Sequence, residues 1–138
     1  MTNTNAGTTN PGQLSQKVIE FIDTTARLVK RAKQPDFSPD EWNELAALVA
    51  VDEFERVSAN KDGRNWQEDM ALRSQWSANA DFDSKIRRIK EAGNLVYMDI
   101  VENVTANGHT NSVNTLGIFE FNEAGKLRKV TAYQQLDR

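Results

Sequence analysis

The chain has 138 residues, of which 38% are hydrophobic and 27% are charged, a composition that is ordinary for a globular protein that folds as one domain. Its formal net charge of −3 gives no overall positive field, so neither nucleic acid nor an acidic membrane is favoured as a partner. The chain has no cysteine, which excludes disulfides, thiolate metal sites and cysteine nucleophiles. Cysteine content does not fix the compartment, and the cytoplasm is the default expectation.

The first residues, from Met1 to Gly12, contain no apolar run. We expect residues 1–12 to form a disordered tail that is neither a signal peptide nor a membrane span. No later stretch approaches the roughly 20 apolar residues that a membrane-spanning helix needs. Residues 13–138 are expected to form a single domain.

Two helices are expected in the first third of the chain. Apolar residues recur at helical spacing over residues 14–33, which predicts an amphipathic helix there. Ser38 and Glu41 match a capping box, and Pro39 occupies the first helical position. Together they predict a second helix that runs to about Ala50.

A short strand and a third helix are expected next. Residues 52–58 alternate in polarity as a half-buried strand does. Asn65, with Glu68 three residues later, predicts the start of a helix. This helix would carry Trp66 and Trp76, for which packing in the core or the pocket wall is the more ordinary role.

The second half of the chain predicts a β-meander. Asn107 with Gly108, and Gly125, mark two hairpin turns, because these residues tolerate positive φ. Phe82, Ile86 and Ile89 fit neither period throughout, so an exposed strand with a bulge is expected there. The expected strands are residues 81–92, 94–104, 112–122 and 126–136. The order α-α-β-α-β-β-β-β defines an α+β domain in which a curved, mainly antiparallel sheet wraps around the three helices.

This order and several short motifs resemble the nuclear transport factor two-like superfamily. Its members include ketosteroid isomerases, limonene epoxide hydrolases and SnoaL-type polyketide cyclases. The hydrolase-like motifs are Val18 to Asp23 in the first helix, and Leu95 to Tyr97, Leu116 to Phe119 and Gly125 to Leu127 in the strands. Phe121 and Asn122, followed by Ala124 to Lys126, resemble the last hairpin of ketosteroid isomerases. The resemblance covers nearly the whole chain after Gln13, and it implies a cone-shaped pocket between the concave sheet and the helices, often in a dimer.

The catalytic residues of these enzymes are not retained. Where the resemblance places the arginine and the two aspartates of the hydrolases, this chain has Ile100, Glu102 and Ala132. One carboxylate therefore remains, in the longer form of Glu102. The positions of the three catalytic side chains of the isomerases are also occupied by other residues: Val57, Phe21 and Gly117. Neither mechanism transfers to this chain, so its status as an enzyme stays open.

Strand alternation predicts which side chains share the pocket face. With the strands placed as the resemblance implies, Glu102 and Glu55 both point inward. Of two close carboxylates one can act as the acid and the other as the base, so both are candidate catalytic residues. The alternative for Glu55 is an ion pair with a cation such as Arg128, or a place at the solvated rim. The same alternative, an ion pair or a place at the rim, stays open for Glu102. The expected ligand-binding residues form a mostly apolar lining: Val57, Trp66, Met98, Ile100, Val113, Thr115, Val130, Ala132 and Gln134.

Such a lining suits a small apolar ligand with a few polar atoms. Three functions are compatible with it: a cofactor-independent isomerase, cyclase or hydrolase, a non-catalytic small-molecule binding protein, and a dimeric interaction module whose pocket is filled by its own side chains. The enzyme ranks first, because a carboxylate on an apolar strand face is costly unless it is paired or used.

Other partners are not favoured. His109 is the only histidine, so we expect no metal site, and no motif indicates a cofactor. The basic run over residues 85–90 is expected to be an exposed strand face rather than a nucleic-acid site. A homodimer is expected through an outer sheet face made of Tyr97, Val101, Leu127 and Tyr133.

Overall fold

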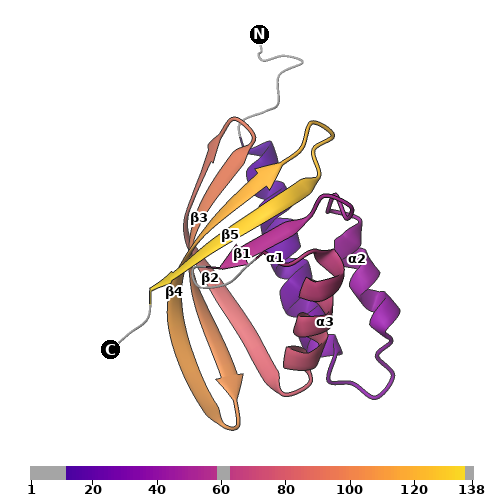
Figure 1. The fold of residues 1–138 in the computed structure, drawn as a ribbon. Helices are drawn as coiled ribbons and strands as arrows, with labels where there is room; N and C mark the ends of the chain where they lie inside the picture. Colours follow the sequence, from indigo (N-terminus) through magenta and orange to yellow (C-terminus); the bar gives the residue numbers. More distant parts are fainter. Residues whose placement is uncertain (1–11, 59–62, 136–138) are drawn as a thin grey trace.

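The computed structural model describes residues 12–58 and 63–135, so the predicted tail lies outside the described residues except for Gly12. The elements follow the predicted order (Figure 1). The helices are α1 (Gln13–Arg31), the 3-10 helix η1 (Pro39–Trp42), α2 (Asn43–Ala46) and α3 (Trp66–Ser77). The strands are β1 (Glu55–Ser58), β2 (Ala80–Ala92), β3 (Leu95–Ala106), β4 (His109–Phe121) and β5 (Leu127–Gln135).

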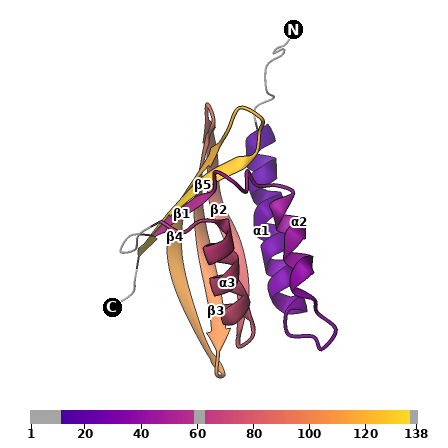
Figure 2. The ribbon, with the colours of Figure 1, turned by 45° about the vertical axis from the view of Figure 1, so that its right-hand side comes forward.

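The five strands form one curved sheet in the order β1-β5-β4-β3-β2. β1 runs parallel to β5, and all other neighbours are antiparallel. The helices lie on one side of this sheet (Figures 1 and 2). The predicted α+β architecture is therefore confirmed, with a concave sheet face turned toward α1 and α3. None of the described helices combines the length and the apolar character that crossing a membrane requires.

Local sequence signals account for the turns and for two helix starts. Asn107 and Gly108 have φ angles of 55° and 79°, which builds the predicted tight turn between β3 and β4. Gly125 has a φ of 77° in the turn before β5. The capping boxes predicted at Ser38 and Asn65 are both present.

The second helix ends earlier than predicted. It begins as the 3-10 turn η1 and continues as α2 only to Ala46, not to Ala50. The cause is a pairing with the start of β5, where the Ala50 amide donates to the Leu127 carbonyl (2.9 Å) and the Leu127 amide donates to the Leu48 carbonyl (3.1 Å). Backbone groups that bond to a neighbouring strand cannot also continue the helix ladder.

Two irregularities in the sheet decide which way side chains point. The predicted bulge in β2 is confirmed, because the register with β3 shifts between Ile86 and Arg88. A second shift, between β4 and β5, leaves Arg128 without a register partner. This shift turns Leu127 into the core, where it is 1% exposed, and Arg128 toward Glu120. The prediction that Leu127 lies on the outer face is therefore wrong.

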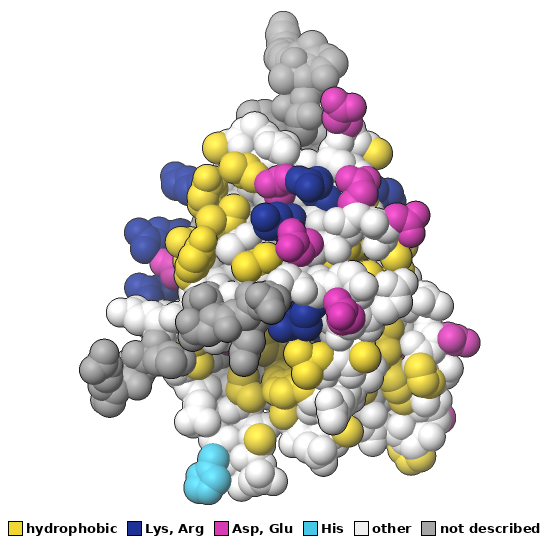
Figure 3. Space-filling view, in the orientation of Figure 1, with side chains coloured by type: hydrophobic (Ala, Val, Ile, Leu, Met, Phe, Trp, Pro, Cys, Tyr) yellow, Lys and Arg dark blue, Asp and Glu magenta, His cyan; other side chains and the backbone are white. Residues whose placement is uncertain are grey.

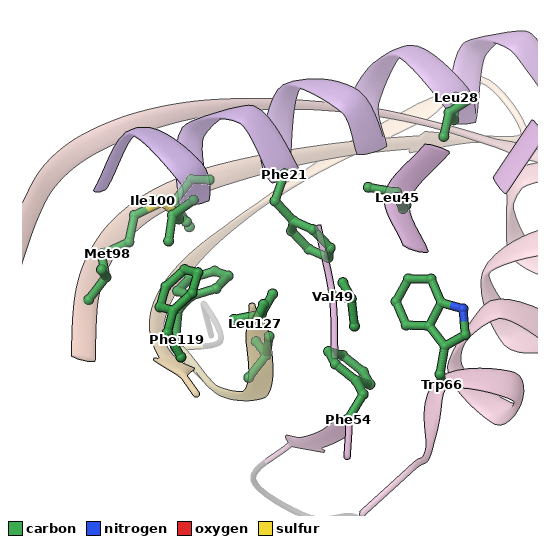
Figure 4. Close-up of a cluster of buried hydrophobic side chains, with 14 of the residues drawn as sticks. Phe21, Leu28, Leu45, Val49, Phe54, Trp66, Met98, Ile100, Phe119 and Leu127 are labelled. Carbon is green, nitrogen blue, oxygen red and sulfur yellow. The ribbon is translucent and has the colours of Figure 1, made fainter. Parts of the chain in front are cut away.

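The hydrophobic core lies between α1 and the concave sheet face (Figure 4). Phe21 points from α1 into a cluster that includes Met98, Ile100 and Phe119 of the sheet. Residues from α2, from the segments beside β1 and from the start of α3 complete the cluster: Leu45, Val49, Phe54 and Trp66. Several of these side chains also form one wall of the cavity described next.

Candidate functional site

A cavity of about 410 Å³ lies between the concave sheet face and the helices α1 and α3. This volume falls within the range of about 300–1,000 Å³ that is typical of small-molecule sites. The helices contribute Ile22 and Thr25 from α1 and Leu72, Arg73 and Trp76 from α3. On the face shown in Figure 3, hydrophobic side chains gather below the centre, where the surface is hollowed.

Most of the predicted inner-face residues line this cavity. They come from β3, β4 and β5 in the predicted alternation: Met98, Ile100, Glu102, Val113, Thr115, Val130, Ala132 and Gln134. Their position in the lining is as expected, while the binding of a ligand by them stays a prediction. The described side chains leave the cavity open, whereas an interaction module was expected to fill its pocket with its own side chains.

Two residues of β1 that were predicted to line the cavity lie on the opposite face of the strand. Arg56 and Ser58 line the cavity, whereas Glu55 and Val57 do not. The parallel register explains this difference, because Arg56 pairs with Val130 and Ser58 with Ala132, and paired residues share a face. A shift of one residue in this pairing exchanges the inner and outer side chains of the strand.

Glu55 is half-exposed and has a cation as its nearest charged partner. Its Oε1 lies 3.7 Å from the Nζ of Lys129, and its side chain is 49% exposed. The alternative interpretation of Glu55, a solvated ion pair, is therefore closer to the structure, although the partner is Lys129 rather than Arg128. The prediction that Glu55 faces the pocket is wrong.

The two tryptophans of α3 have different positions. Trp66, predicted to bind ligand, does not line the cavity. It is buried in the core and meets Phe54 edge-to-face, with 5.2 Å between the ring centroids. Trp76 lines the cavity instead and lies edge-to-face against Phe82 at 6.3 Å.

Glu102 lies on the sheet wall of the cavity with one hydrogen-bond donor. Its Oε1 accepts a hydrogen bond of 2.6 Å from the Oγ1 of Thr115. Thr115 belongs to β4, two residues from Val113, which is the register partner of Glu102. Glu102 has no cation within ion-pairing distance among the described residues. Its carboxylate is thus oriented by one hydroxyl group and is not neutralised by direct contact.

A cluster of three arginines around Asp69 forms another side of the cavity. Asp69 is 3% exposed on α3, and its Oδ1 accepts hydrogen bonds from the Nε and Nη2 of Arg64, each of 3.2 Å. Its Oδ2 accepts one from the Nε of Arg56 (3.2 Å) and a longer one from the Nη2 of Arg73 (3.5 Å). We name these four residues the Asp69 cluster. All four line the cavity.

The fold brings the Asp69 cluster together from three segments. The backbones of Arg56 and Arg64 exchange two hydrogen bonds of 2.9 Å, which holds their side chains next to each other. Asp69 and Arg73 are four residues apart on α3 and so share one helix face. The four-residue spacing is visible in the sequence, but the approach of Arg56 and Arg64 depends on the tertiary fold, and the sequence analysis missed the cluster.

The charges in the cluster shift the pKa of two members. Burial alone would raise the pKa of Asp69, but the charges of Arg56, Arg73 and Arg64 outweigh it and hold the pKa below its usual value. Burial, with the like charge of Arg56, lowers the pKa of Arg73 to about 10, although Asp69 and Glu102 oppose this shift. Arg73 therefore remains a cation at neutral pH, and its charge acts on both carboxylates of the cavity.

The residue types in the cavity define what it can do chemically. No group of three or more histidine, aspartate or glutamate side chains converges as a metal site within the described parts of the chain. The available groups are a carboxylate held by a hydroxyl, three largely buried guanidinium groups and an apolar wall. Such a set can exchange a proton with a bound molecule and stabilise negative charge on it.

No protein-family model matches the chain. No curated protein sequence matches it either. Solved structures do match, at low sequence identity. An LEH-like epoxide hydrolase of M. tuberculosis is 14% identical with a TM-score of 0.65, covering 87% of this chain and 84% of its own. An NTF2-like protein of Burkholderia xenovorans is 13% identical with a TM-score of 0.68, covering 91% and 92%.

The BvnE pinacolase of Penicillium brevicompactum is 16% identical with a TM-score of 0.69, covering 89% of this chain and 86% of its own. At these identities the likeness shows the fold. The chain thus has the nuclear transport factor two-like fold, as the sequence resemblance implied.

Proposed function

We propose that the cavity binds a small, largely apolar molecule and that Glu102 acts on it as an acid–base group. The reaction would be an isomerisation, a cyclisation or a hydrolysis that needs no cofactor. The observation that carries this proposal is the state of Glu102, a cavity carboxylate with a single hydroxyl partner among the described residues. A carboxylate in such surroundings is costly to the fold, which favours a role in function.

Under this proposal the two oxygens of Glu102 have different tasks. Oε1 is held by Thr115, which fixes the plane of the carboxylate. Oε2 has no hydrogen-bond donor among the described residues. It is therefore the oxygen that would take a proton from the ligand, or from the attacking water in a hydrolysis, and return it to the product. The charge of Arg73 lies near enough to act on Glu102 and would also stabilise negative charge that develops on the ligand.

The fold comparisons support the class of activity. Two of the solved structures with this fold are named an epoxide hydrolase and a pinacolase. Because one fold hosts many functions, this support is analogy. Non-catalytic binding is the second candidate, and it is favoured by Ile100 and Ala132, which stand where the resemblance places an arginine and an aspartate.

The test compares the protein with its Glu102→Gln variant on a panel of apolar epoxides and unsaturated ketones in deuterated water. Mass spectrometry would follow product formation and deuterium uptake. We expect the substitution to lower turnover by at least about 100-fold, the usual contribution of a general acid–base group, while ligand affinity changes little. Glu55→Gln, outside the cavity, is the matched control and should retain full turnover.

Turnover that survives Glu102→Gln would contradict the assignment. Binding of panel members without product formation by the unsubstituted protein would favour the second candidate instead.

A further inference from the structure

We propose that the ligand of this cavity is a monoanion, an apolar body that carries one carboxylate, and that Arg73 with Arg56 and Arg64 binds this group. The inference rests on the proposed function, since it concerns the ligand of the same cavity. It assigns a second task to that site: the arginines hold the anionic end, and Glu102 faces another part of the ligand.

The hydrogen bonding of the Asp69 cluster leaves donors unused. Asp69 accepts four hydrogen bonds, two on each oxygen, which fills the acceptor capacity of a carboxylate. Each guanidinium has five N–H groups. Three arginines therefore offer far more donors to the cavity than Asp69 can accept.

Arg73 is the least satisfied of the three. Its link to Asp69 is a single hydrogen bond of 3.5 Å, at the upper limit for such a bond. Its Nε is buried and has no hydrogen-bond partner among the described residues. Its side chain is only 16% exposed, so solvent offers little compensation. A buried guanidinium with unused donors on a cavity wall is the arrangement that a bound anion would complete.

The charges of the cavity indicate a monoanion rather than a dianion. By formal charge, the lining has three cationic residues, Arg56, Arg64 and Arg73, and two acidic ones, Asp69 and Glu102. One positive charge is therefore left without a counterpart. A carboxylate would balance it, whereas a phosphate dianion would leave a net negative charge. A bound anion would also offset the mutual repulsion and burial that lower the pKa of Arg73.

The apolar lining fixes the character of the remainder of the ligand. The wall opposite α3 contains Met98, Val113 and Val130. Arg73 projects from α3, beside Leu72 and Trp76. A ligand with one charged end and an apolar body would therefore match both parts of the lining.

The test measures binding of apolar acids and of their neutral amides to the complete protein. The probes are naphthoate, phenylbutyrate and octanoate, each paired with its amide, and isothermal titration calorimetry gives the two dissociation constants. We expect at least one acid to bind at least about tenfold more tightly than its amide, because hydrogen bonds to a charged group are strong. Arg73→Gln should reduce this preference to near unity.

Three further variants make the outcome decisive. Arg87→Gln removes an exposed arginine of β2 outside the cavity and should leave the preference unchanged. Arg64→Gln, at a side chain that is 25% exposed, should reduce it and serves as the test if Arg73→Gln does not fold. Glu102→Gln should keep or increase it, because a like charge is removed. The preference thus reports on the arginines, while turnover reports on Glu102.

Equal binding of acids and amides, or no binding of any acid at millimolar concentration, would overturn the inference. So would a preference that survives the arginine substitutions. Each of these binding results could occur while Glu102→Gln still loses turnover, so the proposed function could hold without the inference. Conversely, the acid-over-amide preference could be found while Glu102→Gln keeps full turnover. The inference and the proposed function can therefore fail separately.

Discussion

The cavity has two carboxylates, Asp69 and Glu102, which differ in burial and in the number of charged neighbours. Asp69 is almost fully buried on a helix and is surrounded by three guanidinium groups. Glu102 lies on a strand and receives one hydroxyl hydrogen bond. The first carboxylate has its charge neutralised within the protein, whereas the second keeps acceptor capacity for a ligand. Asp69 therefore holds the arginines in place, and Glu102 is the group to which we assign the proposed acid–base role.

The largest loss of unfolding free energy is expected from Asp69→Asn. The amide has the shape of the carboxylate but no charge, so three arginines would lose their anion in a buried place. Breaking a buried ion pair by neutralising one partner costs about 3–5 kcal/mol of unfolding free energy. Urea unfolding at pH 7 measures this loss. Asp81→Asn is the control, because Asp81 is 53% exposed and faces Lys33 at 3.4 Å, and it should change little. A loss for Asp69→Asn as small as that of the control would contradict the distinction between the two carboxylates.

The same contrast predicts a dependence on pH. The pKa of Asp69 is lower in the folded protein than in the unfolded chain, whose value is near 3.8. The folded state therefore binds this proton less readily, and the stabilisation is fully present above the unfolded pKa and lost as pH falls through the folded pKa. The difference in unfolding free energy between the unsubstituted protein and Asp69→Asn should stay constant from neutral pH to about pH 5 and shrink below about pH 4. A difference that grows on acidification would show that the sign is wrong.

Glu102→Gln should have a much smaller effect on stability. Glutamine can still accept the hydrogen bond from Thr115, and no described cation loses a direct ion pair. We expect unfolding free energy at pH 7 to be unchanged or slightly higher, within about 1 kcal/mol, because surplus functional charge is commonly a burden on the fold. A loss of about 2 kcal/mol or more would identify Glu102 as a structural ion-pair partner.

The two carboxylates also differ in whether their surroundings could be predicted from the sequence. Hairpin turns and capping boxes depend on residues close in the chain, and those at Asn107, Ser38 and Asn65 were predicted correctly. Glu102 was placed in the lining because antiparallel neighbours and a family resemblance fixed the face of its strand. The Asp69 cluster joins β1, a turn segment and α3, and no local pattern specifies that meeting.

The errors on β1 and β5 have the same origin. The face of Glu55 depends on a parallel pairing with β5, a strand more than seventy residues later in the chain. The directions of Leu127 and Arg128 depend on a register shift against β4. Alternation predicts which residues share a face, but the pairing between strands decides which face is buried. A shift of one residue reverses the assignment of every side chain concerned.

The outer face of the sheet carries large hydrophobic side chains that are exposed to solvent. Tyr97, Leu116 and Tyr133 are 38%, 42% and 50% exposed, and Leu116 and Tyr133 are register partners. We propose that a second copy of the chain covers them, since exposed apolar side chains that are neighbours favour association. Tyr97→Glu with Tyr133→Glu should then shift sedimentation toward the monomer without changing ligand binding. An unsubstituted protein that is monomeric at high micromolar concentration would disprove the dimer.

The smallest change in stability and in ligand binding is expected from Glu55→Gln. This variant is therefore the reference for the two cavity carboxylates. Glu55 was predicted from the sequence to share the pocket with Glu102, yet it lies outside the lining and is half-exposed beside Lys129 at 3.7 Å. Exposed ion pairs contribute between about 0 and 1 kcal/mol, because water screens them and both side chains lose freedom in forming them. The substitution should therefore change unfolding free energy by less than about 0.5 kcal/mol at pH 7, and it should leave the acid-over-amide preference and any turnover intact. Urea unfolding and calorimetry on the same preparation measure both quantities. A clear loss of ligand binding would mean that Glu55 reaches the cavity in solution. The parallel register of β1 in solution would then have to differ from Glu55 opposite Lys129.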